Sequence, residues 1–116
     1  MTKVFILTIG IVLTFMNSSI AQEKRIDTAY FHTDGVCKMC KERIENAGLI
    51  KGVKYIEWNK ETGQTMVVYK TSKTNSETVQ KAIAEAGHNT SAHKCSPEAY
   101  GKIPGCCKYM DGVEKH

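Results

Sequence analysis

A chain of 116 residues can hold one small domain, and its core is modest because short chains bury only about 60 to 65% of their surface on folding. Its formal net charge of +4 is scattered along the sequence rather than gathered in runs, so the composition gives no support for nucleic-acid binding. The 5 cysteines are an odd number, so disulfide pairing in an oxidising compartment would leave at least one thiol over.

The first 21 residues have the pattern of a secretory signal peptide. Lys3 precedes an uncharged, mostly apolar run from Val4 to Met16, and Ser19 and Ala21 put small residues where a signal peptidase cleaves. The apolar run is shorter than the roughly 20 residues that a spanning helix needs, and a retained membrane anchor is the alternative interpretation. We therefore predict export to the periplasm, or secretion, with residues 1–21 removed and no membrane attachment afterwards.

Residues 28–33 alternate in polarity and are rich in aromatic side chains, which predicts a strand. From Cys37 the spacing becomes helical, with Cys40 and Ile44 on one face, and Gly48 can end the helix. The two cysteines therefore open a short amphipathic helix.

Residues 53–59 and 64–71 are rich in β-forming side chains and flank the sequence KETG, which predicts a hairpin. Ser76 offers the N-cap of a second helix, whose apolar stripe is closed by Gly87. Residues 88–92 are expected to form a short, polar fourth strand.

The predicted order is strand, helix, strand, strand, helix, strand, which is the α+β, ferredoxin-like βαββαβ open-faced sandwich. We assign this domain to residues 22–93, and residues 94–116 to an irregular tail that contains cysteines. In that topology the loops after the first strand and after the second helix lie at the same end of the sheet. His88 is therefore expected near Cys37 and Cys40.

Two thiols three residues apart at the start of a helix can converge on one site, where the positive end of the helix dipole favours thiolate over thiol. Two soft sulfurs in an exposed, open site suit Cu(I) or Hg(II), which accept low coordination, whereas structural Zn(II) prefers four ligands. The same motif serves disulfide oxidoreductases and plain structural disulfides, and both remain alternatives. The only prolines, Pro97 and Pro104, lie in the tail, which argues against a thioredoxin-like domain.

The segment from Ile26 to Ala92 resembles the heavy-metal-associated domain of copper chaperones, periplasmic mercury-binding proteins and the amino-terminal modules of metal-pumping ATPases. The resemblance is carried by C-x-x-C at the helix start, by the Gly-Val pair before the second strand, and by Ala-Gly and a polar residue after the second helix. It implies one soft metal ion on Cys37 and Cys40 that is handed to a partner by ligand exchange. His88 stands where that family varies between Lys, Tyr and His, and is a candidate third ligand whose imidazole titrates near physiological pH.

The tail adds sulfur ligands at Cys95, Cys106 and Cys107. The whole chain resembles exported single-domain proteins of Bacteroidetes type that end in Y-x-K-hydrophobic-P-G-C-C. About 13 residues separate the predicted fourth strand from Cys106, and at roughly 3.3 Å each they reach back to the C-x-x-C motif. Cys106 and Cys107 are therefore candidate ligands of a metal site, while a disulfide from Cys95 to one of them, or free reactive thiols, are the alternatives.

Together these features predict an exported soft-metal-binding protein of the copper chaperone or scavenger type, and not an enzyme. Cu(I) is the first candidate ion, and Hg(II) or Zn(II) are further candidates. A metal transporter or another metal-receiving protein would take the ion, and the chain would act as a monomer or a metal-bridged dimer. The alternative function is a periplasmic thiol–disulfide exchange protein that uses the same C-x-x-C pair.

Overall fold

The computed structural model describes residues 25–112 and 114–116, so the predicted signal peptide, residues 1–21, lies outside the described residues. Across these two ranges, no helix is both long and apolar enough to cross a membrane. The elements follow in the order β1 (Ile26–His32), α1 (Lys38–Gly48), β2 (Val53–Trp58), β3 (Gln64–Lys70), α2 (Ser76–Glu85), α3 (Pro97–Gly101) and the 3-10 helices η1 (Gly105–Cys107) and η2 (Tyr109–Asp111).

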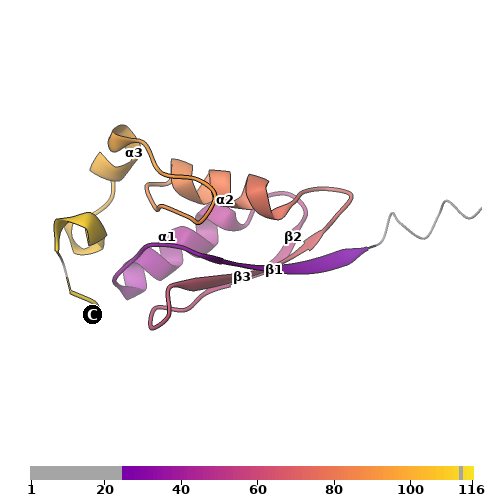
Figure 1. Ribbon diagram of the computed structural model, residues 1–116, viewed down its shortest axis with the longest axis horizontal. Coiled ribbons are helices and arrows are strands. Elements are labelled where there is room, and N and C mark those ends of the chain that lie inside the picture. The colour runs from indigo at the N-terminus through magenta and orange to yellow at the C-terminus, as the bar shows by residue number, and fades with distance from the viewer. Residues whose placement is uncertain (1–24, 113) are drawn as a thin grey trace, which may run out of the picture.

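The three strands form an antiparallel sheet in the order β1-β3-β2, with β3 in the centre. Alternation along the strands puts Phe31, Ile56, Trp58 and Val67 on the inner face, where they are buried. Figure 1 shows α1 and α2 on one side of the sheet. The other face carries exposed side chains such as Tyr30. This is the α+β, open-faced arrangement that the sequence predicts.

Both long helices turn an apolar stripe towards the sheet. The buried residues are Cys40, Ile44 and Gly48 in α1 and Val79, Gln80, Ile83 and Ala84 in α2. The N-cap of α2 is Asn75, whose side-chain oxygen accepts the Thr78 N–H at 2.8 Å. The predicted cap, Ser76, is instead the first helical residue.

The predicted fourth strand is reduced to a single antiparallel bridge between Thr33 and Thr90. The ladder does not continue because nearby backbone groups bond elsewhere. The Thr90 N–H donates to the His93 carbonyl at 2.7 Å, and the Asn89 N–H donates to the Tyr109 hydroxyl at 3.0 Å. The tail therefore takes hydrogen bonds that a fourth strand would otherwise make.

The tail, residues 94–116, is more regular than its sequence predicts, because it contains α3, η1 and η2. Ser96 caps α3 by accepting the Ala99 N–H at 3.1 Å, and Pro97 at the first helical position needs no hydrogen-bond partner there. Figure 1 shows that the tail lies at the end of the molecule where α1 begins. The last cysteines are thereby brought to the C-x-x-C motif.

Candidate metal centre

Cys37 and Cys40 lie one helical turn apart at the start of α1. Cys37 is the N-cap, and its sulfur accepts the Cys40 N–H at 3.3 Å while its carbonyl accepts the Lys41 N–H at 3.1 Å. The two Sγ atoms are 3.2 Å apart. The cap therefore orients both sulfurs towards the same point, as the spacing predicts.

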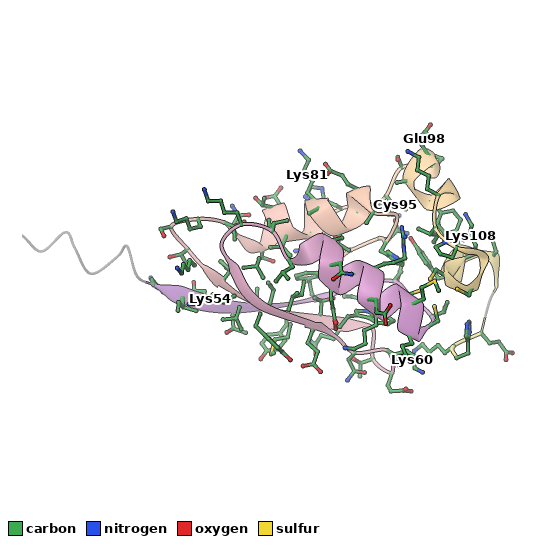
Figure 2. All side chains as sticks on the ribbon, turned by 180° about the vertical axis from the view of Figure 1, so that it is seen from behind. Lys54, Lys60, Lys81, Cys95, Glu98 and Lys108 are labelled. Atoms are coloured by element: carbon green, nitrogen blue, oxygen red, sulfur yellow. The ribbon has the colours of Figure 1, made fainter. Side chains whose placement is uncertain are left out.

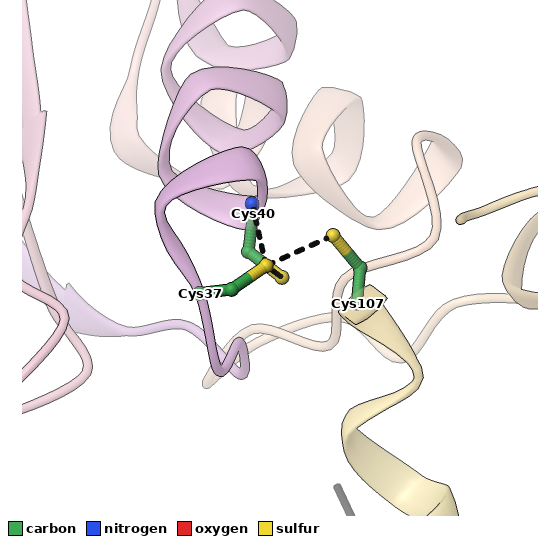
Figure 3. A group of neighbouring side chains, drawn as sticks. All are labelled: Cys37, Cys40 and Cys107. Atoms are coloured by element: carbon green, nitrogen blue, oxygen red, sulfur yellow. Dashed lines mark hydrogen bonds between the residues drawn. The ribbon is translucent and has the colours of Figure 1, made fainter. Parts of the chain in front are cut away.

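Cys107 of η1 brings a third sulfur to this point. The turn after Pro104 is closed by the Cys107 N–H, which donates to the Pro104 carbonyl at 2.8 Å. The Sγ of Cys107 lies 3.3 Å from that of Cys37, and the three sulfur atoms all lie within 4.8 Å of one another. Figure 3 shows the three side chains converging from the helix and the tail.

The tail is fixed to the domain by Tyr109. Its hydroxyl donates to the Gly87 carbonyl at 2.7 Å, and its ring stacks on His88 with centroids 5.6 Å apart. Ile103 adds an apolar contact: it is 4% exposed, and a Cβ on Gly87 would lie only 2.6 Å from its Cγ2. Gly87, at a φ of 104°, thus both ends α2 and leaves space for the tail.

The cysteine site is covered, which corrects the sequence-based expectation of an exposed, open site. Cys37 is 2% exposed, and Cys40 and Cys107 are fully buried. The spacing within C-x-x-C carries no information about a cover whose cysteine, Cys107, lies more than 60 residues later in the sequence. All five cysteines carry free thiols, so no disulfide holds this cover in place.

The three thiols differ in acidity. Burial opposes ionisation of Cys37, but hydrogen bonds from the side chain and backbone of Cys40 and from Cys107 outweigh it and lower the pKa of Cys37. Burial raises the pKa of Cys40 and, together with hydrogen bonds to the two other sulfurs, the pKa of Cys107. The first thiolate therefore forms at Cys37, which lies between its two neighbours.

His88, the candidate third ligand, is fully buried at the end of α2 and lies outside the group of three sulfurs. Its Nδ1 lies 2.9 Å from the Asp34 carbonyl oxygen, which ties the loop before Cys37 to α2. Its Nε2 is buried without a hydrogen-bond partner among the described residues. Burial lowers the pKa of His88, which favours the neutral imidazole in the folded chain. Its role as a ligand stays a prediction.

The other tail cysteines, Cys106 and Cys95, lie outside the group of three thiols. The Sγ of Cys106 is 3.9 Å from that of Cys107, whereas the Sγ of Cys95 lies 3.5 Å from the Tyr109 hydroxyl oxygen. Because adjacent residues of a 3-10 helix point in different directions, only Cys107 joins the buried group. Cys107 is directed inward by the contacts that Ile103 and Tyr109, on either side of it in sequence, make with the domain.

The loop before Cys37 packs tightly on the core. A Cβ on Gly35 would lie 2.9 Å from Cζ2 of Trp58 and 3.2 Å from Cβ of Cys40. The Trp58 indole is itself fixed, since its N–H donates to the Thr33 carbonyl at 3.0 Å. The position of Cys37 is therefore set by a glycine lying against a buried ring.

Solved structures of other proteins share this fold. A metallochaperone, CopZ, is 30% identical, with a TM-score of 0.53 over 55% of this chain and 98% of that one. Oxidized MerP from Ralstonia metallidurans CH34 is 28% identical, with a TM-score of 0.54 over 58% of this chain and 96% of that one. A copper form of CopA from Bacillus subtilis, 21% identical with a TM-score of 0.51 over 65% and 97% of the two chains, supports the fold alone. No protein-family model and no curated protein matches the sequence.

Proposed function

Because this chain has the fold of the heavy-metal-associated domains, we propose that it is an exported carrier or scavenger of a soft metal ion and that it catalyses no reaction. The observation that supports this proposal most directly is the convergence of Cys37, Cys40 and Cys107, whose sulfurs lie within 4.8 Å of one another. Three thiols from two distant segments, none of them in a disulfide, can act together as metal ligands. The similarity to the CopZ metallochaperone supports the same proposal.

We propose Cu(I) as the ion. Thiolate sulfur favours soft ions, and Cu(I) is satisfied by two or three such ligands, whereas structural Zn(II) sites are closed by four. The buried group offers three sulfurs, and among the described residues no fourth His, Cys, Asp or Glu side chain lies within 4.8 Å of all three. Hg(II) shares the preference for few thiolates and is the next candidate.

Transfer to a receiver would proceed by ligand exchange. A thiolate of the receiving protein takes the place of one cysteine, which regains a proton from solvent, and the ion is shared until the remaining ligands leave. Cys107 is suited to leave first, because it lies on the tail while Cys37 and Cys40 are fixed by α1. We propose a metal transporter or another exported metal-binding protein as the receiver, in the compartment to which residues 1–21 direct the chain.

The proposal is tested by titrating the reduced protein with Cu(I) without oxygen, against a chelator that competes for the ion. Wild-type protein should retain copper, and Cys37→Ser should weaken binding by more than about 100-fold, since even the loss of a residue behind a ligand costs 10–100-fold. Cys95→Ser is the matched control, because its sulfur lies outside the buried group. Undiminished affinity in Cys37→Ser would reject the ligand assignment.

The copper titration, combined with an assay of disulfide reduction, distinguishes the metal carrier from a thiol–disulfide exchange protein. A thiol–disulfide exchange protein would reduce a disulfide substrate through Cys37 and Cys40 and would release copper to the chelator even as wild type. Cys107→Ser discriminates further, because a third metal ligand should matter for copper retention and not for the turnover of a two-cysteine redox pair.

A further inference from the structure

Two more sulfur atoms lie next to the three buried thiols. The Sγ of Cys106 is 3.6 Å from the Sδ of Met39 and 3.9 Å from the Sγ of Cys107. Met39 occupies the position between the two cysteines of the motif, and its side chain is 46% exposed. In Figure 2, where sulfur is yellow, several sulfur atoms gather beside Lys108, at the end of the molecule opposite Lys54.

We propose that Met39, Cys106 and Cys107 form a second Cu(I) site, with the Cys107 thiolate bridging it to the ion held by Cys37 and Cys40. The inference rests on the proposed function, because the bridging sulfur belongs to the first site. It extends that function from one ion to a two-ion sulfur cluster built partly from the tail.

The distances fit two sulfurs that share one ion. With a metal–sulfur bond of about 2.3 Å, the value for zinc thiolates, two sulfurs lie about 3.8 Å apart on a tetrahedral ion and about 4.0 Å apart on a trigonal one. The separations of 3.6 and 3.9 Å around Cys106 lie close to both values. An ion could therefore bind between Cys106 and either neighbouring sulfur with a change in their separation of a few tenths of an ångström.

The ligand types favour Cu(I) at this second position. A neutral thioether is a weak ligand for Zn(II) but a suitable one for Cu(I), because soft sulfur ligands select Cu(I). Met39 is 46% exposed and its sulfur lies 3.6 Å from that of Cys106, so its thioether is available as a soft ligand at the solvent side of the cluster.

Charge also permits the second ion. Each bound Cu(I) carries one positive charge and Cys106 contributes one thiolate on releasing its proton to solvent, so the addition leaves the net charge of the cluster unchanged. A buried cluster of thiolates is costly if its charge increases, and this addition avoids that cost. Copper remains Cu(I), so the step needs no oxidant or reductant.

The test counts copper ions per chain. Reduced wild-type protein is titrated with Cu(I) without oxygen against a competing chelator, and native mass spectrometry reports the number of ions bound to the monomer. We expect two ions on wild type, one on Cys106→Ser, and two on Met39→Leu with the second held roughly 10- to 100-fold more weakly. Cys95→Ser and Met110→Leu, which change an outlying cysteine and another exposed methionine, should bind two as wild type does.

The outcomes separate the second site from the first. One ion on wild type that is lost in Cys37→Ser would overturn the second site and leave the carrier function intact. Two ions retained in Cys106→Ser would also overturn it. No ion on wild type would reject both proposals together. Cys106 and Met39 are not buried in the core, so the variants should keep the circular dichroism of the wild type.

Discussion

Shortening Ile103 should uncover the buried thiols without unfolding the domain. Ile103 is 4% exposed in the tail and packs against Gly87, so its side chain is released to water when the tail lifts from the domain. Ile103→Ala removes three carbons from this contact, which at about 0.8 kcal/mol for each buried carbon amounts to about 2.4 kcal/mol. Because every 1.4 kcal/mol is a tenfold change, the open population of the tail should rise about 50-fold.

The assay is the rate at which iodoacetamide modifies Cys40 in the metal-free, reduced protein, followed by peptide mass spectrometry. Cys40 is fully buried and reacts only when the cover opens, so its rate should rise in Ile103→Ala by the same factor of about 50. Leu49→Ala is the control, because Leu49 is 56% exposed and distant from the tail in sequence. Amide hydrogen exchange in β3 reports opening of the whole domain and should change much less.

An unchanged modification rate of Cys40 in Ile103→Ala would refute opening of the tail as the route to the buried thiols. Equal acceleration of β3 exchange and of the thiol reaction would also refute it, because the tail would then open only with the whole domain. If β3 exchange accelerates, but less than the thiol reaction, the tail and the rest of the domain open partly as separate units.

Three further predictions concern the groups around the site. The stability of the fold should decrease as pH drops below about 6.5, because His88 is protonated there in the unfolded chain while burial disfavours its protonation in the folded chain. The urea midpoint should therefore fall less between pH 7.5 and pH 5.5 in His88→Gln than in the wild type. Equal falls in the two proteins would refute the assignment. At pH 7, alkylation of the metal-free protein should modify Cys37 before Cys40, since only the former has a lowered pKa; mapping the modified peptides tests the order. Gly35→Ala should cost about 1–3 kcal/mol in chemical denaturation, because its Cβ would lie 2.9 Å from the Trp58 ring, and unchanged stability would show that the loop yields.

The paired strands and the two long helices follow from the periodicity of the sequence. Alternation predicts Phe31 and Val67 on the inner face, and helical spacing predicts the buried stripe through Cys40 and Ile44. The boundaries differ by one or two residues, as at β1, which begins at Ile26 rather than at residue 28. Local patterns suffice here because each element buries one face against its neighbours.

The cover over the thiols does not follow from local patterns. The tail has no extended periodicity, and its position depends on contacts between residues far apart in the chain, such as the hydrogen bond from Tyr109 to Gly87. Which of Cys106 and Cys107 turns inward is decided by those contacts and not by the sequence PGCC. The expected reach of the tail is sufficient, but its length cannot specify which sulfur arrives.

The attachment of Cys107 makes cargo and shape interdependent. An ion held between α1 and η1 would link two segments that lie 70 residues apart in the sequence. By mass action it would favour the closed arrangement over any in which the tail is lifted from the domain. Loaded and empty molecules would then present different surfaces at the end that carries the three thiols. A receiving protein could distinguish the loaded from the empty molecule by its surface, before any sulfur ligand is exchanged.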